Sequence, residues 1–374
     1  MPNCGITGQI PEWVSSQKDL FYLDFKGNDL DGRFPNWLAE LLLFLDLSRN
    51  NFSGELPENI GNAKRIKSLC LGGNGFSGNL PCNLTKMVNL AYLDIHENNI
   101  SGKLHDTLPQ IPTLEVLILR NNSLEGYIPI NISSLSSLRI LDLSHNNLTG
   151  SIPREIANLS RMIKTPNISR SFPSSHSIWA TAFLQESEDL ILNWKKSFRG
   201  LGYLKLDIYS LLDLSDNRIS DEIPPSLGNL KALKLLNISH NMISGHIPMS
   251  FGDLENIESL DLSHNEISGS IPQSLVKLNQ LTVLDVSNNR LTGKIPVGPQ
   301  MDTMVDFENN TGLCGMQIKV TCPEDIRPLK GRGDEEEKQS WFLWEGTWVG
   351  FPFGFVTSIL IMGYFLKFLQ LFKS

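Results

Sequence analysis

Apolar residues recur along this chain in one pattern, L-x-x-L-x-L-x-x-N-x-L-x-G-x-I-P, which appears in eleven near-copies. Successive copies are 24 residues apart nearly everywhere, as measured between the asparagines that hold the same place in each copy. These asparagines are Asn28, Asn50, Asn74, Asn98, Asn122, Asn146, Asn217, Asn241, Asn265 and Asn289, and Cys4 holds this place in a truncated first copy. One copy is too short to bury its own apolar side, so the pattern predicts coils that stack and share a core.

The copy from Leu138 to Pro153 shows how one coil is built. Leu138, Leu141 and Leu143 are predicted to point inward from a short strand and its approach, and alternation leaves Arg139, Ile140 and Asp142 facing outward. The amide of Asn146 can bond backbone groups of neighbouring coils and form a buried polar ladder. Proline in the I-P step suits a return segment outside a central strand. The predicted fold is therefore a leucine-rich-repeat solenoid with one short parallel strand in each repeat of about 24 residues.

The repeats form two blocks, 1–159 and 208–305, separated by an insertion at 160–207 that breaks the pattern. The insertion, which we call the island, mixes aromatic residues with both signs of charge and contains Trp179 and Trp194. Long insertions of this kind are either functional or flexible spacers, and both interpretations stay open. Residues 306–328 follow as a C-terminal cap with Cys314 and Cys322, which predict either a disulfide that closes the open end or two free thiols. Cys70 and Cys82 fall on different sides of the coil and are not expected to pair.

The far end of the chain predicts a membrane anchor. An acidic segment at 329–345 precedes 346–366, a stretch of 21 residues without a charged side chain. As a helix this stretch is about 31 Å long, enough to cross a bilayer, and the tail 367–374 is too short for a catalytic domain. Gly346, Gly350 and Gly354 share one helix face and predict contact with a partner helix, although glycine is common in membrane helices generally. The chain begins within a repeat without a signal peptide, which favours a fragment of a longer secreted protein.

Composition favours an extracellular protein. Ten N-x-[S/T] sequons are present, at Asn51, Asn83, Asn99, Asn121, Asn131, Asn147, Asn158, Asn167, Asn237 and Asn309. A glycan on Asn237 would stand on the outward face of a strand. The net charge of −8, without a basic tract, argues against a nucleic-acid partner.

Enzymatic chemistry is not expected. Aspartates and histidines recur because the repeat recurs, and no nucleophile–base pair, metal cluster or cofactor site emerges. The G-x-G-x-x-G match at 73–78 coincides with repeat positions and has no βαβ context. The Arg-Gly-Asp tripeptide at 332–334 lies in the acidic segment. We interpret both matches as accidental.

Candidate ligand contacts are outward strand residues that depart from the common Asp/Ser/Asn background. They are Asp24, Lys26, Tyr92, His96, Glu97, Glu115 and Arg120, to which the island adds Trp179 and Trp194. Arg120 can bind a carboxylate or phosphate, and Tyr92 offers a flat apolar contact. Each residue taken alone is equally typical of a solvated surface. The predicted patch is therefore Tyr92, His96, Glu97 and Arg120 on adjacent coils.

The order of repeats, island, four repeats, cysteine cap, acidic segment and membrane span resembles plant leucine-rich-repeat receptor-like proteins, which lack a kinase domain. The most specific matches are 211–217 (LLDLSDN), 310–315 (NTGLCG) and 341–346 (WFLWEG). The resemblance implies a single-pass plasma-membrane receptor that binds an extracellular peptide or microbial ligand and recruits receptor kinases through its glycine motif. It also implies a co-receptor kinase surface near Asn237, Ser239, His240, Asp261, Ser263, His264, Asp285 and Asn288. Alternatives are a secreted enzyme inhibitor, a ligand-trapping decoy, or part of a receptor-kinase ectodomain.

Overall fold

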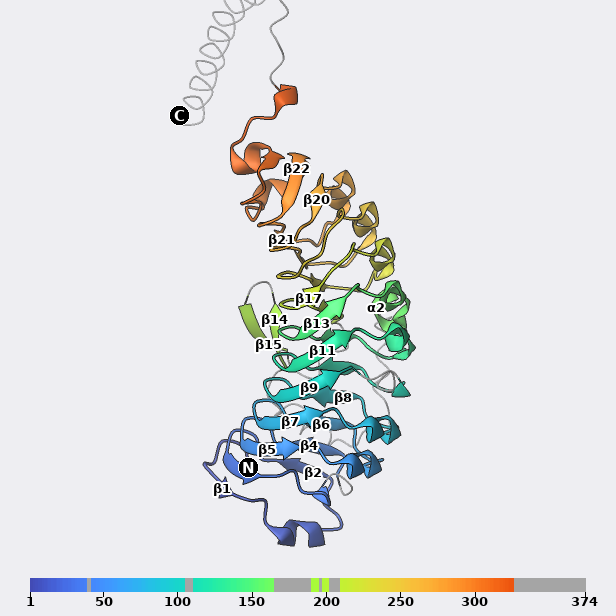
Figure 1. The fold of residues 1–374 in the computed structure, drawn as a ribbon, viewed down its shortest axis with the longest axis vertical. Helices are drawn as coiled ribbons and strands as arrows, with labels where there is room; N and C mark the ends of the chain where they lie inside the picture. Colours follow the sequence, from blue (N-terminus) through green and yellow to red (C-terminus); the bar gives the residue numbers. More distant parts are fainter. Residues whose placement is uncertain (39–41, 105–109, 165–189, 195–196, 202–208, 326–374) are drawn as a thin grey trace, which may run out of the picture. The chain divides into compact units, whose positions relative to one another are not determined.

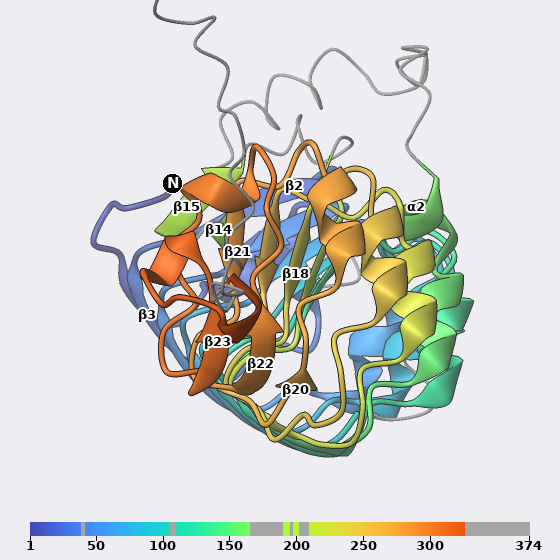
Figure 2. The same cartoon turned by 90° about the horizontal axis from the view of Figure 1, so that it is seen from above.

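The computed structural model describes residues 1–38, 42–104, 110–164, 190–194, 197–201 and 209–325, with only the backbone described at 190–194 and 197–201. Residues Met1–Cys322 form one unit, in which the coils stack one on another (Figure 1). The predicted leucine-rich-repeat solenoid of parallel strands is confirmed. Most coils have three sides, which are a strand of a first sheet, a strand of a second sheet and a short 3-10 helix, as seen along the stack in Figure 2.

The first sheet is parallel and contains one strand from each full coil. In every strand the middle residue points into the core, as Leu117 and Leu141 do, and the residues on either side point outward. Its strands in order are β2 (Tyr22–Asp24), β4 (Phe44–Asp46), β6 (Ser68–Cys70), β8 (Tyr92–Asp94), β10 (Val116–Ile118), β12 (Ile140–Asp142), β16 (Leu211–Asp213), β18 (Leu235–Asn237), β19 (Ser259–Asp261) and β21 (Val283–Asp285).

The second sheet forms at the G-x-I-P step. Its strands are β1 (Thr7–Gly8), β3 (Asp29–Gly32), β5 (Asn51–Glu55), β7 (Gly75–Asn79), β9 (Asn99–Lys103), β11 (Ser123–Tyr127), β13 (Asn147–Gly150) and β17 (Arg218–Ile219). A further sheet continues it with β20 (Ser268–Gly269), β22 (Arg290–Lys294) and β23 (Gly312–Cys314). The glycine of each step has a positive φ, and Asp221, which replaces that glycine in its repeat, keeps the same left-handed conformation at φ 66°.

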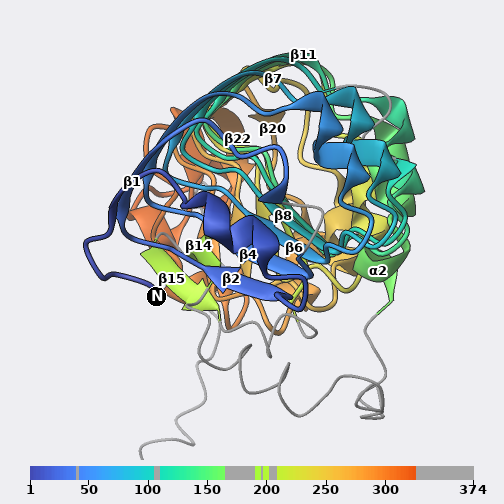
Figure 3. The same cartoon turned by 90° about the horizontal axis from the view of Figure 1, so that it is seen from below.

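A row of 3-10 helices closes the coils, and most of them begin directly after the proline of the I-P step because proline presets the entry φ. The row contains η1 (Glu12–Ser16), η2 (Glu58–Asn62), η3 (Cys82–Lys86), η5 (Ile130–Ser134), η6 (Arg154–Asn158), η8 (Pro225–Asn229), η9 (Met249–Asp253) and η10 (Gln273–Lys277), and α2 (Ser160–Ile163) follows η6. Figure 3 shows this row on the side of the coil away from β1.

The asparagine ladder forms as predicted. Asn146 donates from Nδ2 to the carbonyls of Leu119 (3.0 Å) and Leu143 (3.1 Å), and its Oδ1 accepts from the backbone N–H of Leu124 (3.0 Å). One amide thus joins two coils and satisfies buried backbone groups on both. The same bonds recur at Asn310, which sequence reasoning assigned to the cap and which extends the ladder by one step.

The stack continues across the island. Strand β12 pairs directly with β16, and Asn217 donates to the carbonyl of Leu143 although 74 residues separate them. Within the island, β14 (Leu190–Trp194) and β15 (Ser197–Leu201) form an antiparallel hairpin.

A disulfide joins Cys314 and Cys322 at the C-terminal end of the stack, where η11 (Met301–Thr303) and η12 (Met316–Ile318) lie, and Cys70 and Cys82 are free thiols. A last short 3-10 helix, η13 (Pro323–Asp325), belongs to the second unit of the chain. In the part of the chain that the structure describes, no helix is long and apolar enough to cross a bilayer. The predicted span 346–366, with Gly346, Gly350 and Gly354, lies outside that part.

Candidate ligand-binding face

The outward side of the first sheet, which we call the strand face, carries a buried apolar cluster. Its members occupy the outward positions of adjacent strands and are Tyr92, Val116, Ile118, Ile140, Leu211 and Leu235. Ile140 is 0% exposed although its neighbour Leu141 is the residue that points into the core. The strand face is thus apolar at its centre, on both sides of the point where the chain returns from the island into β16.

Ion pairs across coils flank this cluster. Arg120 on β10's coil lies 3.2 Å from Glu97 (Nη2 to Oε1), and Arg139 lies 2.6 Å from Glu115 (Nη2 to Oε2). Arg120 is only 5% exposed. The guanidinium is therefore closed to a ligand, and its role is to hold the carboxylate of Glu97, whose side chain is 51% exposed.

His96 and Asp94 form a second charged pair beside Arg120. The Nδ1 atom of His96 lies 2.6 Å from Oδ1 of Asp94. Burial alone would lower the pKa of His96, but the hydrogen bond with Asp94 and the charge of Asp94 outweigh it and raise the pKa. His96 therefore keeps a positive charge to higher pH than a free histidine.

Buried carboxylates continue along the third strand position. Asp142 accepts hydrogen bonds from the backbone N–H (3.1 Å) and hydroxyl (2.6 Å) of Ser144, and Asp213 does the same with Ser215. Burial and the neighbouring charge of Asp142 raise the pKa of Asp213 to about 7, and burial also raises the pKa of Asp142. A negative charge on both aspartates at once is therefore unfavourable at neutral pH.

The structure brings the predicted patch together. Tyr92, His96 and Glu97 come from the coil of β8, and Arg120 comes from the next coil, that of β10. Glu115 lies directly before β10 and pairs with Arg139. Asp24 and Lys26 lie three coils away, where the backbone N–H of Lys26 donates to Asp24 (2.9 Å). Trp194 ends β14, and Trp179 lies outside the described residues.

The predicted co-receptor residues differ in exposure. Asn237, Ser239, Ser263 and Asp285 are buried, Asp261 and Asn288 are half-buried, and His240 and His264 are exposed at the turn before the ladder asparagine. Asn237 donates from Nδ2 to Oδ2 of Asp213 (3.2 Å) and accepts from the backbone N–H and hydroxyl of Ser239. The accessible part of this predicted surface is therefore the turn and not the strand.

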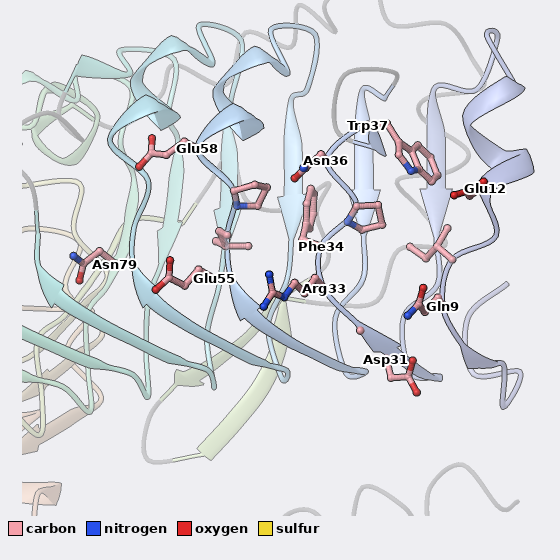
Figure 4. Close-up of a pocket in the computed structure, with 15 residues that line it drawn as sticks. Gln9, Glu12, Asp31, Arg33, Phe34, Asn36, Trp37, Glu55, Glu58 and Asn79 are labelled. Carbon is pink, nitrogen blue, oxygen red and sulfur yellow. The ribbon is translucent and has the colours of Figure 1, made fainter.

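Two hollows lie on the flank at the I-P step, away from the strand face. One, of about 910 Å³, is lined by charged and aromatic side chains that include Asp31, Arg33, Trp37 and Glu55 (Figure 4). The other, of about 740 Å³, contains the exposed ring of Tyr127. Among the described residues, no group of three or more His, Cys, Asp or Glu is placed to hold a metal.

Sequence reasoning missed Arg139 and the apolar Ile118 in this face. The ion pairs were readable from spacing, because Glu97 and Arg120 are 23 residues apart and Glu115 and Arg139 are 24 apart, which is one coil. The burial of Ile118 and Ile140 had no such signal, since alternation predicts which way a side chain points but not what covers it.

Comparison with known proteins agrees with the fold. Family models described as leucine rich repeat match residues 112–162, 209–267, 247–291 and 42–63. Receptor-like protein 46 of Arabidopsis thaliana is 54% identical over 228 residues, which cover 55% of this chain and 28% of that protein. The plant peptide hormone receptor RGFR1 in complex with RGF2 aligns with a TM-score of 0.62 and 28% identity over 82% of this chain and 46% of that one. The Arabidopsis receptor kinase HAESA, in complex with the peptide hormone IDA and the co-receptor SERK1, aligns with a TM-score of 0.60 and 30% identity. The alignment covers 82% of this chain and 48% of that chain.

The stacked coils, the asparagine ladder and the matched models make this chain a leucine-rich-repeat protein. Among such proteins it resembles the plant receptor-like proteins, of which receptor-like protein 46 is an example. The chain spans about a quarter of the length of that relative and about half of the receptor ectodomains that it resembles.

Proposed function

We propose that this chain acts as a plant cell-surface receptor-like protein without catalytic activity of its own, anchored by a single membrane span with its repeats outside. It binds an extracellular peptide or microbial ligand on the strand face between β8 and β12. It signals by associating with receptor kinases, through the last four repeats (residues 209–296) and through Gly346, Gly350 and Gly354.

The observation that carries the ligand proposal is the patch at β8–β12. It combines an apolar centre with the exposed carboxylates of Glu97 and Glu115, which the buried Arg120 and Arg139 hold in place. A rigid sheet that already holds its charged groups in place loses little entropy when it binds an extended peptide. The similar ectodomains named above are described with bound peptide hormones, and one of them with a co-receptor kinase.

The experiment is co-immunoprecipitation of the tagged full-length protein from plant membranes, with partners identified by mass spectrometry. The matched variant changes Gly346, Gly350 and Gly354 to leucine and leaves the repeats unchanged. Receptor kinases recovered with the wild type and lost with the variant support the proposal. If the wild type reaches the plasma membrane and recovers no receptor kinase, signalling by association is wrong, and a ligand-trapping decoy becomes the better interpretation.

A further inference from the structure

The smaller of the two flank hollows, of about 740 Å³, contains an accessible aromatic ring, and we call it the Tyr127 hollow. Tyr127 is 71% exposed. Its ring lies across Gly150 of the next coil, where an added Cβ atom would overlap Cδ1 and Cε1 of the ring. The ring is therefore supported by backbone on one side and open to a ligand on the other.

Polar side chains from neighbouring coils line up with this ring. The same place, directly after the glycine of the G-x-I-P step or after Asp221 that replaces it, is held in successive coils by Lys103, Tyr127, Ser151 and Glu222. Neighbouring strands are about 4.8 Å apart, so three steps carry this line over about 14 Å. Within the described part of the chain, the side chains of Lys103, Ser151 and Glu222 make no hydrogen bond or ion pair with another residue. They are thus available to a ligand.

The floor of the Tyr127 hollow is apolar. Pro129 and Pro153 are buried at the I-P step and lie along it. Ile130, the first residue of η5, stands beyond them and is 66% exposed. An apolar floor with a few polar groups along one rim suits a ligand that has an apolar face and many hydroxyls.

The charges that line the Tyr127 hollow cancel. Lys103 and Arg154 are matched by Glu155 and Glu222, and Nε of Arg154 already lies 3.1 Å from Oε1 of Glu155. The chain as a whole has a net charge of −8, which disfavours the approach of a polyanion. Both observations favour a neutral ligand.

The larger flank hollow has no comparable ring. It occupies the same corner of the first coils, where Arg33 and Glu55 hold the place of Tyr127 (Figure 4). Its aromatic side chains are Phe34, which is buried, and Trp37, which is half-buried. The exposed ring is therefore the feature that distinguishes the Tyr127 hollow.

We propose that the Tyr127 hollow is a second binding site, which takes a neutral, extended, β-linked oligosaccharide. The C–H bonds on one face of such a sugar ring form an apolar surface that stacks on an aromatic ring, while the hydroxyls project around its edge. One sugar unit stacks on Tyr127, and the units on either side bond Lys103 as donor and Glu222 as acceptor. A sugar unit is about as long as the step between coils, so an extended chain keeps in register with this line.

Binding at this site would hold the repeats against a polysaccharide while the strand face stays accessible, because the hollow lies on the flank. The natural source of the sugar rests on the proposed extracellular location. The binding itself depends neither on the ligand proposed for the strand face nor on a kinase partner.

The test is isothermal titration calorimetry of the full-length protein with cellohexaose, a β-linked hexamer of glucose. The protein is kept in micelles of a detergent without a sugar head group, since such a head group would compete. Maltohexaose is the matched probe, because it has the same composition but its α-linkages coil the chain. We expect cellohexaose to bind at one site and maltohexaose to bind at least about five-fold more weakly.

Variants of the ring separate stacking from general effects. Tyr127→Ala should weaken cellohexaose binding about ten-fold or more, whereas Tyr127→Phe keeps the ring and should stay within about three-fold of wild type. The control is Trp13→Ala, since Trp13 is 66% exposed on η1, outside the hollow, and this variant should keep the wild-type affinity. Absence of cellohexaose binding, or an equal loss in Tyr127→Ala and Trp13→Ala, overturns the proposal.

Two other occupants of the hollow are distinguished in the same assay. Asn131 is exposed, follows Ile130 directly and starts a sequon, so N131Q removes any glycan there and should leave the affinity for cellohexaose unchanged. Binding that appears only in N131Q means that the chain's own glycan fills the hollow, and it overturns the assignment to an external sugar. Tighter binding of hexagalacturonate than of cellohexaose makes the hollow an anion site of Lys103 and Arg154 and also overturns it. Because the assay contains no kinase, its result is independent of kinase recovery from membranes.

Discussion

Some side chains on the strand face make hydrogen bonds to neighbouring strands, and the short sequence motifs that contain these residues do not reveal such bonds. Asn237 belongs to an N-I-S sequon, yet it is 6% exposed and its Nδ2 atom donates to Asp213 on the neighbouring strand. A glycan attached to that nitrogen would have to occupy the space between two stacked coils. The sequon motif describes only what the transferring enzyme recognises, so burial decides which of these asparagines stays accessible.

We therefore expect Asn237 to be unglycosylated in the folded protein, whereas Asn99, which is exposed at the start of β9, carries a glycan. Enzymatic deglycosylation in ¹⁸O-labelled water followed by peptide mass spectrometry measures both sites in one digest. Label at Asn237 at a level similar to that at Asn99 would show that the last repeats open during maturation or that the strand is not packed as described.

Asp213 links stability to pH. Its carboxyl titrates near pH 7 in the folded protein because burial and Asp142 raise its pKa, and near pH 4 when unfolded. Between these values the folded state holds more protons than the unfolded state, so the stabilising contribution is complete below about pH 4 and is lost as the pH rises through about 7. The slope for one proton is at most about 1.4 kcal/mol per pH unit.

The expected result is a free energy of unfolding that decreases from about pH 5 to about pH 7.5 in wild type and changes less in D213N. Asparagine is compatible with this site, since Asn237 holds the equivalent place on β18 and accepts the same two bonds from its serine. Urea unfolding at a series of pH values measures the effect, with exposed Asp29 changed to asparagine as the control. Parallel pH profiles for wild type and D213N would contradict it.

Whole elements were the most predictable part of the molecule. The spacing of Leu138, Leu141 and Leu143 predicted a strand, and the structure has β12 there. The ladder asparagines were predicted because they recur at the same place in each copy of the pattern, nearly always 24 residues apart. Asn310 was not predicted as a ladder residue because it follows Asn289 by 21 residues and lies beside the cap cysteines. The burial of outward side chains such as Ile140 on the strand face was not predictable, since it depends on contacts between coils and not on the pattern within one coil.

The ladder amide is the element-scale feature with the largest expected effect on stability. Asn241 accepts from the backbone N–H of Ile219 (2.9 Å) and donates to the carbonyls of Leu214 (3.0 Å) and Ile238 (3.2 Å). Asn241→Ala leaves these groups without a partner, and we expect a loss on the order of 2–4 kcal/mol in the free energy of unfolding. The adjacent Met242→Ala is the control and should stay within about 0.5 kcal/mol. Equal effects of the two variants in urea unfolding would mean that the ladder contributes little.

At the largest scale, residues Met1–Cys322 form a one-dimensional stack, in which each coil is stabilised by its neighbours and the ends are the weakest points. At the C-terminal end the Cys314–Cys322 disulfide, with a sequence separation of 8, holds the last segment against the final coil. The carbonyl of Cys314 accepts from the backbone N–H of Ile295 (2.8 Å), which ties this loop to β22's coil. A loop of this size contributes about 2.5 kcal/mol by constraining the unfolded chain.

Removing the disulfide should therefore loosen the molecule from this end. In C314S/C322S we expect hydrogen exchange to accelerate first at β22 and β23 and then at β21, while the amides of β8 and β10 keep their wild-type protection. Hydrogen–deuterium exchange with mass spectrometry resolves these segments on separate peptides. A uniform acceleration along the whole stack would show that the coils unfold as one cooperative unit, and no change at β22 would show that the ladder bonds of Asn310 close the end without the disulfide. The graded outcome is expected because each coil contacts only its neighbours, so a lost contact at one end is transmitted step by step.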